Sequence, residues 1–396
     1  MTYRFPNYLF ILTIFLIIFS CSQKKKVLFR IEDNGEEGFI DSTGKVVITP
    51  KFAWVGDFND GLAVAGNDTS YGYIDEQGKL VIPYKFDLDS YPLSLYSLKK
   101  VPNELRSAIN EASFADGLAL FFDAIKKRYG YINTKGEVVI EPIFLNATRF
   151  KQGYAVVMTS IDNSNWENTR LGVIDIKGKI VIQDKYYKLS RLSDNFLTAT
   201  LATKKGESYY FSSIVLNNKG NVVNTLIPGQ IGLFGEFSNG YSYGSNALLH
   251  QLTGKGYFIY DSTGKTLNNP DNDETLYFED VRINKGKFFW IKRDNKYSWF
   301  TLHNKNMKIV DLKVYDTIKG GFDVNGIACV KYHNPQTNKS LFGYIDTLGN
   351  FILEPKFDNA SNFRNGLAIA SLTSGELIII GYINKKGEFV WSKEIR

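Results

Sequence analysis

The sequence contains few of the residues that build metal centres, disulfide frameworks and most catalytic sites. Its 396 residues include two cysteines and three histidines. The histidines are isolated, and no pair has the spacing of a metal site. The sequence also lacks a Cys-x-x-Cys pair, a Gly-x-Ser-x-Gly nucleophile motif and a phosphate-binding loop. We therefore expect a protein that is not an enzyme and that holds no metal and no cofactor.

Long runs of charge of one sign are absent too. The chain has 47 Lys and Arg against 41 Asp and Glu, a formal net charge of +6. The two signs are interspersed, except at Lys24–Lys26. Because nucleic-acid-binding proteins show a basic stripe or patch, this pattern predicts no nucleic-acid partner.

The apolar run at the N-terminus, from Tyr8 to Phe19, follows a lone Arg4. It is too short to span a bilayer, which takes about 20 residues, and it suits the central region of a secretory signal peptide. The run ends in Ile18-Phe19-Ser20-Cys21, which resembles the lipobox of bacterial lipoproteins. This resemblance implies that residues 1–20 are removed and that Cys21 is lipidated.

A lipidated Cys21 would attach the chain to the membrane of the bacterial cell envelope through a tether of residues 21–26. Ser22 lacks the Asp that favours inner-membrane retention in lipoproteins, so the outer membrane is favoured over the inner. An uncleaved signal anchor, or a secretory peptide with a chance cysteine, is the alternative. Cys329 then has no intramolecular partner, and its apolar neighbours predict a small buried side chain.

One phrase dominates the rest of the chain. It first reads Gly38-Phe39-Ile40-Asp41-Ser42-Thr43-Gly44-Lys45-Val46-Val47-Ile48-Thr49-Pro50, and further copies begin at Gly72, Gly130, Gly172, Gly343 and Gly381. An Asp or Asn three residues before a Gly predicts a type I turn with a bulge between two strands. The pairs with this spacing are Asp41/Gly44, Asp75/Gly78, Asn133/Gly136, Asp175/Gly178, Asn217/Gly220, Asp261/Gly264, Asp346/Gly349 and Asn384/Gly387. We interpret these residues as structural; a calcium site needs more oxygen ligands than one carboxylate per turn.

A second phrase lies between these copies. Phe58-Asn59-Asp60-Gly61-Leu62-Ala63-Val64 matches segments that begin at Phe114 and Phe363. Asp-Gly or Asn-Gly before an apolar run marks a tight turn into a strand. Proline follows the first phrase at 50, 83, 142 and 355, and we expect it to end the strand because it cannot donate to the ladder.

The two phrases together predict an all-β fold of tandem repeats, each with three or four short antiparallel strands. About nine such units occupy residues 27–396, and the spacing is typical of β-propeller blades. Nine exceeds the usual four to eight blades, so the pattern leaves open a closed ring or an open superhelical array.

The two phrases resemble the WG-repeat family of bacterial proteins. Many family members have Trp-Gly where this chain has Tyr-Gly, Phe-Gly or Leu-Gly, which changes the size of the aromatic residue and keeps the pattern. The resemblance implies all-β repeats and an interaction role, and it transfers no catalytic residue.

Aromatic residues make up 15% of the chain. Most occupy equivalent positions in the repeats, as core filling predicts, but exposed rings on a repeat surface also stack on sugars. Trp166 lies in a polar segment outside the pattern and is our candidate contact residue. We therefore expect a scaffold that binds an unknown protein partner, with a glycan-binding lipoprotein as the alternative. A hydrolase, with acids from different repeats such as Asp271 or Glu279 converging, is a third hypothesis.

Overall fold

The computed structural model describes residues 27–67, 69–87, 111–160, 170–191, 196–205, 208–225, 241–245, 257–261, 280–283, 288–293, 296–303, 306–311, 317–319, 322–323 and 325–395. Every element of this described chain is a β-strand, and the strands form nine antiparallel sheets. The predicted all-β class is therefore confirmed. Within the same residues, no helix is long and apolar enough to cross a membrane.

The first four sheets cover the N-terminal half of the chain. Their strands are β1 (Phe29–Asp33), β2 (Glu36–Ile40) and β3 (Val46–Phe52); β4 (Trp54–Val55), β5 (Leu62–Gly66), β6 (Ser70–Asp75) and β7 (Leu80–Asp87); β8 (Leu118–Asp123), β9 (Arg128–Asn133) and β10 (Val138–Phe144); and β11 (Asn146–Ala147), β12 (Tyr154–Ser160), β13 (Arg170–Asp175) and β14 (Ile180–Tyr186).

The remaining five sheets continue in chain order. Their strands are β15 (Lys188–Arg191), β16 (Phe196–Lys205), β17 (Ser208–Asn217) and β18 (Val222–Thr225); β19 (Tyr241–Ser245) and β20 (Tyr257–Asp261); β21 (Asp280–Ile283), β22 (Phe288–Arg293), β23 (Lys296–His303) and β24 (Asn306–Asp311); β25 (Thr317–Lys319), β26 (Ala328–Asn334), β27 (Lys339–Ile345) and β28 (Phe351–Phe357); and β29 (Asn359–Ala360), β30 (Ala368–Ser374), β31 (Leu377–Ile383) and β32 (Phe389–Ile395).

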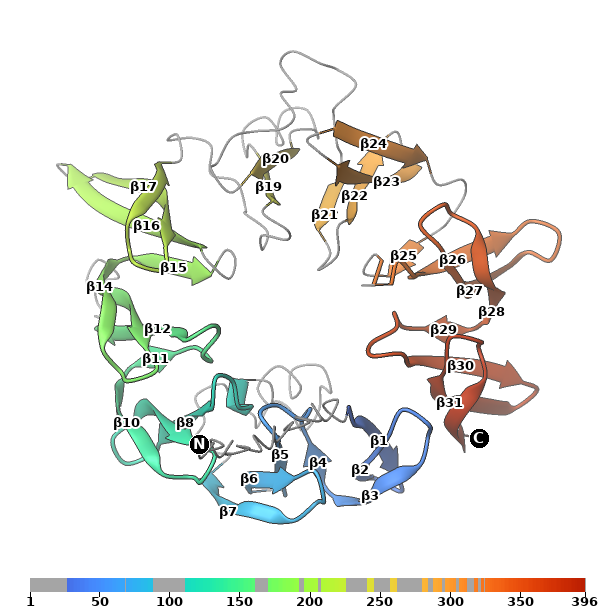
Figure 1. The fold of residues 1–396 in the computed structure, drawn as a ribbon, viewed down its shortest axis with the longest axis horizontal. Coiled ribbons are helices and arrows are strands. Elements are labelled where there is room, and N and C mark those ends of the chain that lie inside the picture. Colours follow the sequence, from blue (N-terminus) through green and yellow to red (C-terminus); the bar gives the residue numbers. More distant parts are fainter. Residues whose placement is uncertain are drawn as a thin grey trace, which may run out of the picture.

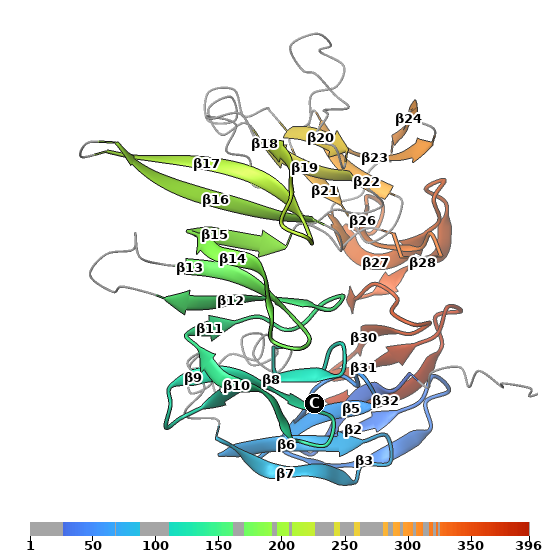
Figure 2. The ribbon, with the colours of Figure 1, turned by 60° about the vertical axis from the view of Figure 1, so that its left-hand side comes forward.

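The sheets follow one another around a closed ring (Figure 1). Short first strands such as β4 lie toward the centre, and last strands such as β7 and β10 lie on the outside. The sheet β29–β32 ends the circle beside β1–β3, and the turned view shows the same neighbours (Figure 2). The ring closes through contacts of this pair, so of the two arrangements that the sequence leaves open the structure has the closed one.

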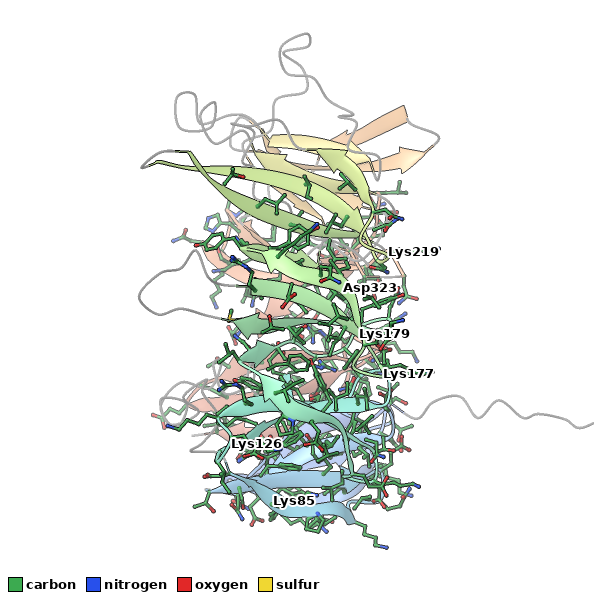
Figure 3. The ribbon with its side chains drawn as sticks, turned by 90° about the vertical axis from the view of Figure 1, so that its left-hand side faces the viewer. Lys85, Lys126, Lys177, Lys179, Lys219 and Asp323 are labelled. Carbon is green, nitrogen blue, oxygen red and sulfur yellow. The ribbon has the colours of Figure 1, made fainter. Side chains whose placement is uncertain are left out.

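The Asp/Asn-x-x-Gly segments form the hairpin turns between the two outer strands. In the first of them, Asp41 Oδ1 accepts hydrogen bonds from the backbone N–H groups of Thr43, at 2.9 Å, and Lys45, at 3.2 Å. Gly44 has a φ of +87°, in the left-handed region that glycine adopts without a steric penalty. The turns that carry Lys177, Lys179 and Lys219 lie on the same flat face of the ring, at the right in Figure 3.

The prediction that proline ends the outer strand is wrong. Strand β3 continues through Pro50 to Phe52, and β7 continues through Pro83 to Asp87. Both prolines sit on the outermost strand of a sheet, where a register shift interrupts the ladder. An edge strand with a bulge tolerates a residue that lacks an N–H donor.

The second phrase forms type I′ turns on the central side of the ring. Asp60 and Gly61 have φ values of +50° and +81°, as this turn requires of both central residues. Consecutive turns are joined, since Asp60 Oδ2 accepts a hydrogen bond from the N–H of Gly117 at 2.9 Å. Asp116 Oδ2 accepts from the N–H of Gly153 at 2.7 Å in the same way.

The core fills the spaces between neighbouring sheets. In four Gly-Tyr/Phe-Ile phrases the aromatic residue packs on the Phe of the next sheet's turn, with ring centroids 4.6–4.8 Å apart. These pairs are Phe39–Phe58, Tyr73–Phe114, Tyr131–Phe150 and Tyr344–Phe363. Phe39, Tyr73, Tyr131 and Tyr344 are fully buried, so at these positions the aromatic residues fill the core.

Candidate functional site: the seam of the ring

We call the interface between the last sheet, β29–β32, and the first, β1–β3, the seam. The Tyr382 hydroxyl donates a hydrogen bond to the Arg30 carbonyl at 2.8 Å, and the Tyr382 ring lies 5.6 Å from that of Phe29. Lys393 forms an ion pair with Glu32 across the same interface. On the outer side, Gly44 lies directly against the backbone of Val390. The hydrogen bond of Tyr382 and the ion pair of Lys393 join residues 352 and 361 positions apart in the sequence.

A cavity of about 750 Å³ opens at the seam. One wall comes from the start of the described chain, including Val27 and Arg30, and another comes from Asp57 and Phe58 of the second sheet. The last sheet contributes the turn around Arg364 and the side chain of Tyr382, and the preceding sheet contributes Lys319. We call this space the seam cavity; its volume lies within the usual range of ligand pockets, about 300–1,000 Å³.

The charged groups around the seam cavity are mostly basic. Arg30, Arg364 and Lys319 line it together with a single carboxylate, that of Asp57. Arg30 is held in place because its Nη1 donates a hydrogen bond to the Val55 carbonyl at 3.0 Å. Burial raises the pKa of Tyr382 to about 12, although the nearby guanidinium of Arg30 acts in the opposite direction. The Tyr382 phenol is therefore neutral at physiological pH and acts as a hydrogen-bond donor.

Glu37 lies beside this region and is mostly removed from water. Burial raises its pKa, while a hydrogen bond that its Oε2 accepts from the Val55 N–H, at 2.7 Å, lowers it. Its carboxylate and the Arg30 guanidinium thus bind the two backbone groups of the same residue, Val55. This arrangement fixes the inner strand β4 of the second sheet against the first sheet.

The structure places most of the residues that we predict to be structural in turns. At Asp75, Asn133, Asp175, Asn217, Asp346 and Asn384, one side-chain oxygen accepts two backbone hydrogen bonds from residues two and four positions later, at 2.8–3.2 Å. Their glycine partners Gly78, Gly136, Gly178, Gly220, Gly349 and Gly387 have φ values between +75° and +82°. Asp261 is the last residue of β20, and Gly264 lies outside the described residues.

The other predicted site residues stay apart from this cavity or outside the described chain. Cys21, Trp166 and the acids Asp271 and Glu279 all lie outside the described residues. Cys329 is buried, and desolvation raises the pKa of its thiol to about 12, so it stays protonated. In the described ranges, no group of three or more His, Cys, Asp or Glu side chains is placed to hold a metal ion.

Our sequence analysis did not identify the seam cavity or its arginines. One signal was available: every later copy of the Gly-Tyr-Ile phrase in the N-terminal region follows a Phe-x-x-Gly turn, whereas Gly38 follows none. A second signal is Arg364, which stands directly after the turn Phe where Asn59 and Ala115 stand in other sheets.

Comparison with a protein family identifies the repeat unit. The family described as WG containing repeat matches at residues 38–68, 71–88, 129–160 and 342–373. The chain carries WG repeats. The WG repeat at 129–160 begins in β9 and ends with β12, so it contains the two outer strands of one sheet and the two inner strands of the next. The matches at 38–68 and 342–373 join two sheets in the same way, whereas the match at 71–88 covers β6 and β7 of one sheet.

The fold of the WG-repeat ring has relatives among solved structures. A crystal structure of a eukaryotic initiation factor is 12% identical, with a TM-score of 0.53, and the match covers 94% of this chain and 96% of that one. Hsv2 from Kluyveromyces lactis is 12% identical over 71% of this chain and 94% of its own, with a TM-score of 0.34. TolB from Acinetobacter baumannii is 12% identical over 85% and 77%, with a TM-score of 0.26. At such identity the first similarity shows a β-propeller-like fold alone. No curated protein matches this chain.

Proposed function

We propose that this protein is a lipid-anchored, non-enzymatic scaffold of the bacterial cell envelope that binds a protein partner on its ring of WG repeats. The observation that carries the proposal is the position of the seam cavity at the start of the described chain. Val27 lines the cavity. A lipid on Cys21 lies six residues away, a reach of at most about 20 Å at about 3.3–3.6 Å per residue.

The chemistry of the repeats supports a scaffold rather than a catalyst. The Asp and Asn side chains of the hairpin turns are bound to their own backbone, as in Asp75, whose Oδ1 accepts bonds from the N–H groups of Gln77 and Lys79. The aromatic residues fill the interfaces between sheets. A partner would meet a ring of sheets with a basic cavity at the seam, and repeat folds commonly present such surfaces for interaction.

The anchor is tested with a Cys21→Ala variant expressed in a bacterium beside the unchanged protein. We expect the unchanged protein in the membrane fraction, beginning at residue 21 and carrying the added mass of acyl chains by mass spectrometry. The variant should lose that mass and leave the membrane fraction. A chain that begins elsewhere, or that carries no acyl mass, contradicts the lipoprotein.

The partner is tested by cross-linking the lipidated protein in cells and identifying the captured proteins by mass spectrometry. We expect one dominant partner whose capture depends on the intact ring. A destabilised variant such as Phe114→Ala provides the comparison. Capture of nothing above background would reject a stable protein partner.

A glycan remains the second candidate, because the partly exposed rings of Phe58 and Tyr382 line the seam cavity and aromatic faces stack on sugars. Binding of cell-wall fragments by the purified protein, measured with and without Trp166→Ala, distinguishes this candidate from the scaffold. The glycan-binding lipoprotein predicts a loss on that substitution, and the protein scaffold predicts none.

A further inference from the structure

Three neighbouring hairpin turns carry exposed lysines on one flat face of the ring. They belong to the third, fourth and fifth sheets and comprise residues 133–137, 175–179 and 217–221. Figure 3 shows the labelled lysines of the fourth and fifth sheets on this face, at the right of the view. We call the surface of the three turns the lysine face. Its exposed lysines are Lys135, Lys177, Lys179 and Lys219.

The three turns form a continuous row, because each later turn packs on the sheet before it. A Cβ at Gly178 would lie 3.3 Å from the side chain of Ile140 in the third sheet. In the same way, a Cβ at Gly220 would lie 3.2 Å from the side chain of Ile182 in the fourth sheet. The tips of the three turns therefore belong to one surface.

The acids of these turns are fewer than the lysines and are bound within the turns. Asn133 and Asn217 begin two of the turns, and the amide oxygen of each accepts the two backbone hydrogen bonds that a carboxylate accepts in the fourth sheet. These two turns thus lack the negative charge of an Asp. Asp175 uses its Oδ1 for two N–H groups of its own turn, and Glu137 accepts a hydrogen bond from the Asn133 side chain at 2.7 Å. Four lysines are accordingly set against two acids.

The ammonium groups of the lysine face form no ion pair with any of the described residues. Lys126 differs, since it pairs with Glu141 at 3.1 Å. It lies in the β8–β9 hairpin, at the other end of β9 from residues 133–137 and hence on the opposite flat face. The equivalent turn of the eighth sheet, residues 346–350, contains an Asp and no lysine. The excess of free positive charge is therefore not a general property of the turns.

Exposed aliphatic side chains lie among the lysines. Ile176, at the tip of the fourth sheet's turn, is 45% exposed, and Ile180, directly after that turn, is 41% exposed. Val138 and Val222 hold the position of Ile180 in the third and fifth sheets and are 48% and 56% exposed. The three turns contain no Trp, Tyr, Phe or Arg. Because protein–protein interfaces are enriched in aromatic residues and Arg and depleted in Lys, this composition fits a protein partner poorly.

We propose that the lysine face binds the anionic surface of a lipid bilayer, with its lysines at the lipid phosphates and its aliphatic side chains at the boundary of the acyl chains. A bilayer offers both chemistries in one plane, as the turns do. Lysines near such a surface are attracted by its negative potential, and apolar side chains beside them enter the interface. The long stems of the lysines let their charged ends reach the phosphates. This inference goes beyond the proposed function, because the surface would bind a bilayer whether or not Cys21 carries a lipid.

Binding through the lysine face sets the orientation of the ring. The face that carries Lys177 and Lys219 would lie against the bilayer, and the face that carries Lys126 and Lys127 would point away from it. The two pairs of lysines therefore serve as an internal comparison within one protein.

Lysine labelling on vesicles tests this orientation. The purified full-length protein is mixed with vesicles of phosphatidylglycerol and phosphatidylcholine, or of phosphatidylcholine alone. A water-soluble amine-reactive reagent is added, and mass spectrometry follows the modification of each lysine. Anionic vesicles should slow the labelling of Lys177 and Lys219 about fivefold, the factor that corresponds to the attraction of one lysine, and leave Lys126 and Lys127 within about twofold. Vesicles without anionic lipid should protect neither pair, and high salt should reduce the protection.

Two double variants show whether the charge of this face is responsible. Lys177→Glu with Lys219→Glu should abolish most of the protection of Lys135, which remains on the face. Lys126→Glu with Lys127→Glu is the matched control and should leave that protection unchanged. Circular dichroism checks that both variants fold, which we expect because the substituted side chains lie in surface turns.

Three results would overturn the proposal. They are equal labelling of the two lysine pairs on anionic vesicles, stronger protection of Lys126 and Lys127, and failure of the protein to bind these vesicles. Capture of an acidic protein on Lys177 or Lys219 in cells, without protection by vesicles, would replace the bilayer by a protein partner.

The outcome is independent of the proposed lipid anchor. Acyl mass on Cys21 without protection of the lysine face rejects this inference and keeps the lipoprotein. Protection of the lysine face in a protein that carries no acyl mass keeps the inference and rejects the anchor.

Discussion

The interface between the second and third sheets and the seam are built from equivalent positions but are filled differently. In the former, Tyr73 packs on Phe114 at 4.8 Å and its hydroxyl donates to the Ala112 carbonyl at 2.7 Å. In the seam, Tyr382 packs on Phe29 at 5.6 Å and donates to the Arg30 carbonyl. The regular interface contains an inner segment between the two sheets, and the seam has a cavity of about 750 Å³ in that place.

This difference shows how a repeat that straddles two sheets closes a ring. The outer strands can meet across the seam as they do elsewhere, and Gly44 packs on Val390 much as Gly178 packs on Ile140 of the preceding sheet. At the inner edge of the seam, the described residues line the seam cavity. Closure of the ring thus also forms the seam cavity.

The largest effect should come from deleting an aromatic ring at a regular interface. Phe114 is 0% exposed and Phe29 is 8% exposed. Replacing a buried Phe by Ala costs about 3–5 kcal/mol. We expect Phe114→Ala to cost the full amount and Phe29→Ala to lie at or below the lower end, because its surroundings already border a cavity. Urea titrations followed by circular dichroism compare the two, and equal midpoints for the two variants would contradict the comparison.

Replacing a hairpin glycine by alanine should have the next largest effect on stability. Here the variant at the seam should lose more stability than the variant at a regular interface. A Cβ at Gly178 meets only side-chain atoms of Ile140, at 3.3 Å, so the main cost of Gly178→Ala is the left-handed φ of +78°, about 1–2 kcal/mol. A Cβ at Gly44 overlaps the backbone of Val390, which cannot turn aside. Gly44→Ala should therefore cost about 1–3 kcal/mol more, as overpacking does.

Thermal unfolding ranks these two glycine variants, and limited proteolysis locates the damage. For Gly44→Ala we expect new cleavage near the seam, in the first or last sheet. Cleavage that begins in the fourth sheet in both variants would show that the seam is not the weaker point.

The sequence predicts the repeats well because each turn is determined locally. An Asp whose own oxygen binds the backbone two and four residues later, followed by a Gly at positive φ, needs no information from distant residues. Pro50 misled the prediction because its tolerance depends on β3 being the outermost strand, which only the assembled sheet reveals. The seam cavity is beyond local prediction for the same reason. Arg30 and Arg364 both line this cavity only because the ring closes.

Removing one tyrosine hydroxyl should have a smaller effect on stability, and it compares the seam with the regular interfaces at a single hydrogen bond. A net contribution of about 0.5–1.5 kcal/mol is typical of one hydrogen bond. We expect Tyr131→Phe and Tyr344→Phe to lie at the upper end, because both rings are fully buried. Tyr382→Phe should lie at the lower end, since water in the seam cavity can replace the hydroxyl. Urea midpoints of the three variants provide the measurement. A larger loss for Tyr382→Phe would contradict the expectation that water in the seam cavity replaces its hydroxyl.

As the pH rises, the Tyr382 phenol should ionise in the folded ring before those of Tyr131 and Tyr344, whose pKa values are raised further. Burial raises the pKa of Tyr382 to about 12, above the ordinary value of 10.0, and raises those of Tyr131 and Tyr344 further. Because the unfolded chain releases its phenol protons first, stability is complete below pH 10 and falls as the pH rises toward 12. Tyr382→Phe removes the part of this loss of stability that comes from the phenol at the seam. Tyr129→Phe is the control, since burial also raises its pKa to about 12 and it lies away from the seam.

Thermal midpoints between pH 9 and 12, combined with seam cleavage by an alkaline-tolerant protease, test this order. Protection of the seam by Tyr382→Phe, and no such protection by Tyr129→Phe, is the expected result. An identical pH profile for the unchanged protein and Tyr382→Phe would mean that ionisation of this hydroxyl does not weaken the contact between the first and last sheets.

The smallest effect should come from the ion pair across the seam. The Lys393 and Glu32 side chains are 29% and 43% exposed, and such pairs contribute about 0.2–1 kcal/mol. The hydrogen bond from Lys393, followed by one from the Gly35 N–H, lowers the pKa of Glu32. This contribution is therefore complete above the ordinary pKa of a Glu and is lost as the pH falls through the lowered value. Lys393→Met should lower the thermal midpoint slightly at pH 7, the loss should shrink as the pH falls through the lowered pKa of Glu32, and high salt should reduce it. A loss at pH 7 as large as that of Phe29→Ala would show that the seam is held by charge rather than by its packed outer strands.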